Sequence, residues 1–236
     1  MTLSTVPVIF DLDGTLVDPA GGIQDGIAAA LAAVGMPVPG PEVLQSMIGP
    51  KLSDALLNTV GVPADLLDET IRLYREYYRS TGIGQGRVYP GVRELLTELQ
   101  AAGHTLAVAT QKPEGLAHVV LEHHGLAGFF TSIRGSSEVE TLAGVHLGKK
   151  EIIGQALLDL GTAAAVMVGD RAQDVAGALA NGIDCIGVRW GFAVDGELEA
   201  AGAAALVDQP AEVAAAVATL TAFAAVTVQE ETNGAV

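Results

Sequence analysis

The chain has 236 residues, half of them hydrophobic, which is enough for one large domain or for a core domain with a smaller one inserted. Twelve basic residues against 28 acidic ones give a net charge of −16, which argues against nucleic acid or an anionic membrane as a partner, because both bind through dense lysine and arginine. The single cysteine, Cys185, excludes an intramolecular disulfide. With no secretory signal and no membrane-spanning run, we expect a soluble cytoplasmic protein.

The first predicted strand, residues 6–10, ends in two carboxylates. The sequence VIFDLDGTLVD places Asp11 directly after the apolar run and Asp13 two residues later, followed by Gly14. A continuous apolar run without alternation is typical of a parallel strand that is covered on both faces. Gly14 allows the strand to give way to a loop directly after the second carboxylate.

The segment 18–86 is predicted to be a helical cap inserted after this strand. From residue 17 to residue 86 the chain shows no clear strand, and prolines divide it into stretches with apolar residues at helical spacing. These stretches cover residues 23–34, 42–47, 52–60 and 65–78. A glycine-rich segment, 81–91, then leads back to the core, where Pro90 is expected to start the next helix.

Three later segments repeat the pattern of the first: a short apolar run, then polar residues, then a helix signal. These runs cover residues 105–109, 163–168 and 185–188. Alternation of such strands with helices predicts an α/β fold with a doubly wound parallel sheet. We expect residues 1–17 and 87–226 to form this core and residues 227–236 to be a disordered tail.

Polar residues stand at the carboxyl end of each of the first three strands, where ligands bind in doubly wound sheets. Thr110 follows the second strand and Asp170 the third, with Asp174 one helical turn further on. We expect them to meet Asp11 and Asp13. Carboxylates this close repel one another and raise one another's pKa unless a cation lies between them. Oxygen ligands without a histidine or cysteine cluster favour Mg²⁺ over zinc or copper.

Such a site is suited to phosphoryl transfer. One carboxylate can act as a nucleophile and a second as the acid and base. The Thr110 hydroxyl and the helix that starts after Lys112 and Pro113 offer hydrogen-bond donors to phosphoryl oxygens. Two roles stay open for Lys112: it contributes to the phosphate site, or it only precedes the helix without a functional role. Another lysine is expected to complete the cradle, and helical periodicity allows either Lys149 or Lys150.

These residues lie in four motifs in the order FDLDGTLVD, VATQKP, KKEII and VGDRAQD. With them, the chain resembles haloacid dehalogenase (HAD) superfamily phosphatases of the phosphoglycolate phosphatase and 5′-nucleotidase type, which carry a helical C1-type cap. The resemblance covers nearly the whole chain. It implies that Asp11 is the nucleophile and a Mg²⁺ ligand, and that Asp13 is the acid and base and gives the metal its backbone carbonyl.

The resemblance also implies the remaining roles. Asp170 would bind the metal, and Asp174 would support it or its waters. The set that holds the phosphoryl group would be Thr110, Gln111 and Lys149, since the similar proteins place their lysine where Lys149 stands. Similar proteins also place a Gly-Pro turn of the cap over the site, which here brings Gly49 and Lys51 toward the leaving group. Arg171 is expected to brace the loop after Asp170.

The function expected from these features is Mg²⁺-dependent hydrolysis of a small phosphorylated metabolite, phosphoglycolate or a nucleoside 5′-monophosphate, through an aspartyl phosphate. One alternative is a sugar phosphomutase with the same core. A dehalogenase needs neither the second carboxylate Asp13 nor the metal ligand Asp170, so both residues argue against it. A phosphate-accepting receiver domain also combines strand-end acids with Thr and Lys, but the helical insertion of about 70 residues argues against it.

Overall fold

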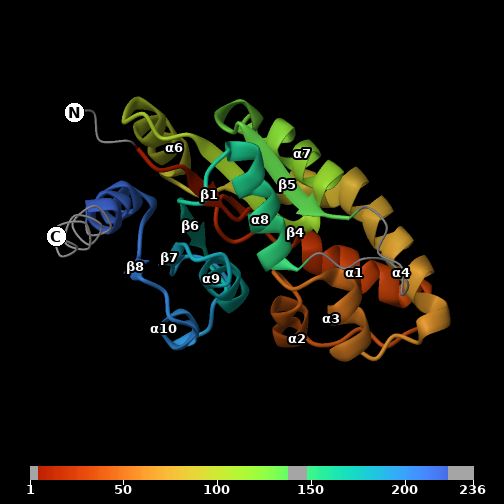
Figure 1. Ribbon diagram of the computed structural model, residues 1–236. Coiled ribbons are helices and arrows are strands. Elements are labelled where there is room, and N and C mark those ends of the chain that lie inside the picture. The colour runs from red at the N-terminus through yellow and green to blue at the C-terminus, as the bar shows by residue number, and fades with distance from the viewer. Residues whose placement is uncertain (1–4, 138–147, 223–236) are drawn as a thin grey trace, which may run out of the picture.

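A six-stranded parallel sheet forms the centre of the computed structural model, which describes residues 5–137 and 148–222 (Figure 1). The strand order is β5-β4-β1-β6-β7-β8. The bounds are β1 Val8–Phe10, β4 Leu106–Pro113, β5 Ser132–Ser136, β6 Val166–Gly169, β7 Asp184–Val188 and β8 Ala205–Val207. The expected doubly wound α/β fold is confirmed. The tail 227–236 lies outside the described residues.

Successive side chains of β1 enter separate hydrophobic layers, because side chains alternate between the faces of a strand. Val8 and Phe10 pack with α6 (Val92–Ala101) and α7 (Glu114–His123). Ile9 packs on the other face with α8 (Lys149–Leu160) and α9 (Ala172–Leu179). Burial on both faces explains the continuous apolar runs of the central strands.

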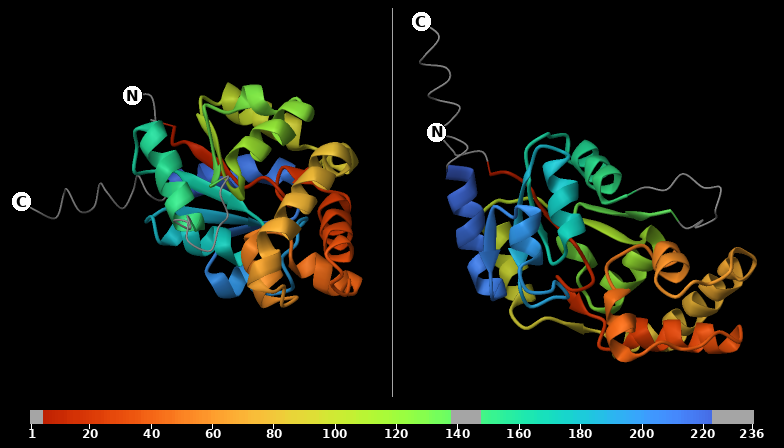
Figure 2. Two further views of the ribbon diagram at one scale, coloured as in Figure 1. Left: turned by 90° about the vertical axis from the view of Figure 1, so that its right-hand side faces the viewer. Right: turned by 90° about the horizontal axis from the view of Figure 1, so that it is seen from below.

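The segment between β1 and α6 is mainly helical, as expected. It contains α1 (Gly22–Ala33), α2 (Pro41–Ser46), α3 (Leu52–Asn58), α4 (Ala64–Tyr77), the π-helical turn η1 (Tyr78–Gly82) and α5 (Ile83–Gln85). Figures 1 and 2 show α1 to α4, in red to orange, gathered at one end of the molecule. No helix within residues 5–137 and 148–222 is long and apolar enough to cross a membrane.

Two details at the ends of the predicted insertion are wrong. A strand, β2 (Val17–Asp18), begins it and pairs with β3 (Arg87–Val88) in an antiparallel ribbon, so the two ends of the insertion lie side by side. The glycine-rich return, for which no secondary structure was predicted, begins within η1 and contains α5. Helix α6 begins at Val92, because Gly91 is its N-cap and the Val92 N–H still bonds to the Tyr89 carbonyl.

The sheet has two strands that were not predicted, β5 and β8, and both lie at its edges. The sequence of β5, SIRGS, has no apolar run, and β8 has three residues within an alanine-rich stretch. Strand β4 was predicted to end at residue 109 but continues to Pro113, after a register shift beyond Ala109. Three short helical elements connect these strands and helices. They are the 3₁₀ turns η2 (Ala127–Phe129) and η3 (Pro210–Glu212) and the helix α10 (Glu197–Ala201).

Candidate active site

Asp11 and Asp13 are buried where β1 turns into a tight loop. The Asp11 N–H donates to the Val168 carbonyl at 2.9 Å, which continues the pairing of β1 with β6 beyond Phe10. The loop closes through a hydrogen bond of 2.9 Å from the Gly14 N–H to the Val17 carbonyl. Gly14 has a φ of 88°, which a residue with a side chain rarely adopts. The loop therefore sets both carboxylates at the carboxyl edge of the sheet.

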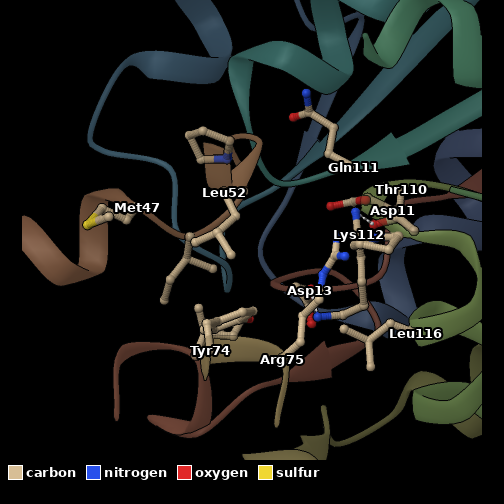
Figure 3. Close-up of a pocket in the computed structure, with 15 residues that line it drawn as sticks. Asp11, Asp13, Met47, Leu52, Tyr74, Arg75, Thr110, Gln111, Lys112 and Leu116 are labelled. Carbon is tan, nitrogen blue, oxygen red and sulfur yellow. Dashed lines mark hydrogen bonds and ion pairs between the residues drawn. The ribbon is translucent and has the colours of Figure 1, made fainter. Parts of the chain in front are cut away.

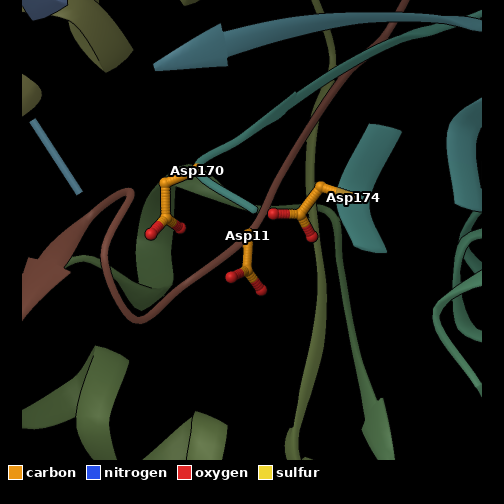
Figure 4. Close-up of side chains that lie close together, drawn as sticks. All are labelled: Asp11, Asp170 and Asp174. Atoms are coloured by element: carbon orange, nitrogen blue, oxygen red, sulfur yellow. The ribbon is translucent and has the colours of Figure 1, made fainter. Parts of the chain in front are cut away.

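Asp11, Asp170 and Asp174 form a buried acidic cluster, in which one carboxylate oxygen of each lies within 4.8 Å of the other two (Figure 4). Asp170 follows β6 and accepts hydrogen bonds from the Thr15 hydroxyl at 3.0 Å and the Phe192 N–H at 2.8 Å. Asp174, in the first turn of α9, accepts one from the Arg171 N–H at 3.0 Å. The sequence predicted this convergence, but it gave no signal for Thr15 and Phe192.

Glycines leave the space that Asp170 occupies. A Cβ atom on Gly14 would lie 2.2 Å from the Asp170 Oδ2, and one on Gly191 would lie 2.4 Å from it. Both distances are far shorter than a van der Waals contact. Gly169 likewise leaves space for Asp174, because a Cβ atom on Gly169 would lie 2.4 Å from the Asp174 carboxylate. The backbone is thus fitted closely around two of the three carboxylates.

The electrostatics of the cluster call for a cation. Burial first, and then the charges of Asp174 and Asp11, raise the pKa of Asp170 well above its usual value. Burial also raises the pKa of Asp174 to about 6, although Lys149 opposes the shift. A hard divalent cation would offset this repulsion, and the donors are all carboxylate oxygens without histidine or cysteine. The chemistry of the donor set fits Mg²⁺.

Lys149 lies inside the cluster. Its ammonium is 2.6 Å from the Asp11 Oδ1 and 2.6 Å from the Asp174 Oδ1. Burial lowers the pKa of Lys149, but the two carboxylates raise it further, so the net shift is upward and the side chain stays charged. Lys150 is exposed, which leaves Lys149 as the lysine directed into the site. Helix α8 begins at Lys149, so this ammonium is fixed by the first turn.

Lys112 pairs with Asp13 at the other side of the site. The Lys112 ammonium lies 2.7 Å from the Asp13 Oδ2, and it stands 4.5 Å from the centre of the Tyr78 ring. Burial raises the pKa of Asp13, and Lys112 offsets this only in part. Thr110 is buried, and its hydroxyl accepts from the Lys112 N–H at 3.3 Å. The sequence left Lys112 undecided and gave no signal for Tyr78, which enters from the π-helical turn.

A pocket with a cavity of about 60 Å³ opens between the core and the helical insertion (Figure 3). The core contributes Asp11, Asp13, Thr110 and Gln111 to its walls, and the insertion contributes the loop Ile48–Pro50. Further lining comes from Ile23, Met47, Leu52, Tyr74, Arg75, Lys112, Pro113 and Leu116. Of the two residues that the cap motif suggested, Gly49 lies in this lining, and Lys51 is buried at the start of α3.

The raised pKa of Asp174 predicts how the stability of the metal-free protein depends on pH. Its usual pKa of 3.8 applies to the unfolded chain, and the folded value is about 6, so between them the folded state holds more protons. The free energy of unfolding is therefore expected to fall as the pH rises from about 4 to about 6. Thermal unfolding in EDTA measures this slope. Asp174→Asn should make the slope shallower, and equal slopes for the two proteins would contradict the prediction.

The sequence and the structure of this chain are similar to those of many known proteins. The sequence model of the haloacid dehalogenase-like hydrolase family matches residues 8–188. A 5′-nucleotidase of Pseudomonas aeruginosa is 40% identical over 195 residues, which cover 82% of this chain and 86% of that protein. A plasmid-encoded phosphoglycolate phosphatase of Cupriavidus necator is 35% identical over 213 residues, 88% of this chain and 91% of that one.

Two further relatives widen the comparison. The tyrosine-protein kinase PtkA of Mycobacterium tuberculosis is 38% identical over 187 residues, 78% of this chain but only 62% of that protein. Among solved structures, a predicted phosphatase from Clostridium acetobutylicum superposes with a TM-score of 0.81 at 36% identity. The match covers 89% of this chain and 97% of that one.

Proposed function

Since the chain belongs to the haloacid dehalogenase-like hydrolase family and is a phosphatase of small phosphorylated molecules, we propose that it cleaves them through a phosphoaspartate at Asp11. The observation that supports this is the position of Asp11 between the acidic cluster and the pocket. Its carboxylate belongs to the group of three acids and also lines the cavity where a substrate would lie. We therefore expect the phosphorus atom of a bound monoester to lie next to a carboxylate oxygen of Asp11.

The proposed reaction has two steps. An Asp11 oxygen forms a bond to phosphorus while the bond from phosphorus to the leaving oxygen breaks, and Asp13 donates a proton to that oxygen. Asp13 then takes a proton from a water molecule, whose oxygen attacks the phosphoaspartate and releases inorganic phosphate and free Asp11. The raised pKa of Asp13 supports its role as the acid, because it allows the carboxyl group to hold a proton at higher pH than usual.

The phosphoryl group would be held by the donors around Asp11, namely the hydroxyl of Thr110, the amide of Gln111 and the ammonium of Lys149. All three positions lie at the carboxyl edge of the sheet, two at the end of β4 and one at the start of α8. Charged and hydroxyl donors there stabilise the negative charge of the transferring group. Lys149 already contacts Asp11, which keeps its ammonium within reach of a phosphoryl oxygen.

Mg²⁺ would be held by the carboxylates of Asp11, Asp170 and Asp174 and by the backbone carbonyl of Asp13. When bound, it neutralises part of the negative charge of the phosphoryl group and of the cluster. The chain's own contribution is to hold these oxygens in place through Thr15, Phe192 and the close-fitting glycines. This rigid arrangement lowers the reorganisation that binding would otherwise require.

We assign residues 18–86 to the cap and residues 1–17 and 87–226 to the core. The β2–β3 ribbon joins the two ends of the cap, and the cap loop Ile48–Pro50 faces Asp11 and Asp13 across the pocket. A cap in this position excludes bulk water and selects the leaving group. The small cavity and the names of the relatives together favour small monoesters, with phosphoglycolate and nucleoside 5′-monophosphates as the first candidates.

A panel of monoesters tests this proposal. Phosphoglycolate, nucleoside 5′-monophosphates and hexose phosphates are compared by kcat/KM with Mg²⁺ and with EDTA. We expect release of inorganic phosphate that needs Mg²⁺ and is highest for one of the first two classes. Conversion of hexose 1-phosphate to hexose 6-phosphate without phosphate release would instead support the phosphomutase alternative. Turnover that persists in EDTA would contradict the role of the metal.

A further inference from the structure

Arg171 joins three separate parts of the molecule. Its backbone N–H donates to the Asp174 carboxylate at 3.0 Å, within the acidic cluster. Its side chain reaches the other way, where Nη1 donates to the Ile48 carbonyl of the cap loop at 2.6 Å. The Nε donates to the Glu197 carboxylate of α10 at 2.9 Å. The metal-binding loop, the cap and α10 therefore meet at one residue.

The guanidinium is fixed in direction by Glu197. That carboxylate also accepts from the Ala172 N–H at 2.8 Å and the Val194 N–H at 3.1 Å, so the core holds it from two sides. The side chains of Arg171 and Glu197 are only 14% and 13% exposed, which limits screening by solvent. A planar guanidinium held at Nε presents its Nη1 donor in one orientation, toward the Ile48 carbonyl.

The cap loop is shaped to accept this side chain. Gly49 has a φ of 97°, and a Cβ atom on it would lie 3.1 Å from the Arg171 Cγ and 3.3 Å from its Nη1. A side chain at this position would thus press against the guanidinium, in addition to straining the backbone. The loop approaches Arg171 closely because residue 49 has no side chain.

We propose that Arg171 is a positioning residue that holds the cap loop Ile48–Pro50 over the pocket and so determines how tightly substrates bind. The inference rests on the proposed function, because it assumes that the pocket under this loop takes the substrate. The two tasks of Arg171 use different atoms. Its backbone N–H supports Asp174 whatever the side chain is, whereas its guanidinium donates to the Ile48 carbonyl of the cap loop. Substitution of the side chain separates them.

The test uses Arg171→Lys and Arg171→Met in the full chain. Lysine keeps a charge opposite Glu197, but its single ammonium cannot reproduce the fork that serves both Glu197 and the Ile48 carbonyl. Hydrogen–deuterium exchange of the backbone amides of residues 47–52, with Mg²⁺ and without substrate, measures directly how firmly the cap loop is held. We expect faster exchange there in both variants. We also expect KM for the best monoester to rise about tenfold with a smaller change in kcat.

The control is Arg189→Lys. Among the described residues, the ion pairs of Arg189 join it to the exposed side chains of Glu199, in α10, and Asp208, so no change in cap exchange or KM is expected. The midpoint of the Mg²⁺ titration, followed by thermal unfolding, should stay unchanged in all variants. Unaltered exchange and KM in both Arg171 variants would overturn the inference. A shift of the Mg²⁺ midpoint would overturn it as well, by showing that the side chain supports the metal loop. Exchange needs no turnover, so this outcome stays separate from failure of the phosphatase proposal.

Discussion

Asp11→Asn is expected to lower kcat by about 10⁴-fold or more, because an amide oxygen is a poor nucleophile toward phosphorus. The fold is expected to survive. Asparagine has nearly the same size, and Lys149 keeps its second ion pair, with Asp174 at 2.6 Å. Phosphate release under saturating monoester and Mg²⁺ measures the loss, and thermal unfolding verifies that the variant is folded.

Asp13→Asn provides the matched comparison, since it changes the other carboxylate of the same loop. With p-nitrophenyl phosphate the leaving group needs no proton, so the first step continues while the second is slow. We expect a phosphoryl group to accumulate on Asp11, visible in the intact mass of Asp13→Asn and absent from the double variant with Asp11→Asn. If Asp11→Asn retains more than about one hundredth of the wild-type kcat, another residue carries the phosphoryl group.

Asp170→Asn is expected to have opposite effects on stability and on activity. In the metal-free protein, removing one buried charge relieves the repulsion from Asp174 and Asp11 that raises the pKa of Asp170. The amide also suits the local hydrogen bonds, because its oxygen can accept from the Phe192 N–H and its nitrogen can donate to the Thr15 hydroxyl. The melting temperature in EDTA at pH 7 should therefore rise by about 3 °C or more.

The same substitution removes a ligand from the proposed metal site, so kcat/KM is expected to fall by about 10²-fold or more. The stabilisation that Mg²⁺ gives the wild type should shrink at the same time. The control Asp208→Asn changes an exposed carboxylate, 67% accessible, and should alter neither quantity. A metal-free Asp170→Asn protein that melts below the wild type would show that Asp170 stabilises the fold without a cation.

The central strands and the acidic cluster could be predicted because local pattern and global topology agree there. Strand β1 is buried on both faces, so its apolar run is continuous, and parallel strands bring their carboxyl ends to one edge. Asp11 and Asp170 follow paired strands, and their meeting needs no other information. Lys149 required the resemblance to known phosphatases, since helical periodicity alone also allowed Lys150.

The residues that support the cluster could not be predicted, because they are fixed only by the folded chain. The hydrogen bond from Thr15 to Asp170 spans 155 residues, and no local pattern identifies it. Tyr78 was expected at the end of a regular helix, but it begins the π-helical turn η1, from which its ring reaches Lys112. The pair of Arg171 with Glu197 depends on the position of α10. Strand β5 could not be predicted for another reason: its residues, SIRGS, include no apolar run, and two of them are only partly buried.

Strand β1 lies at the middle of the sheet although it comes first in the chain, and this has a consequence for biosynthesis. Val8 pairs with Leu106 on one side and with Val166 on the other, so the strand acquires its second neighbour only after most of the polypeptide has left the ribosome. Pairings this distant in sequence form slowly. A nascent chain that stops before β6 contains Asp11 but neither Asp170 nor Asp174, which follow that strand. The proposed metal site can therefore form only after β6 and the first turn of α9 have been synthesised, and we expect shorter chains to release no phosphate.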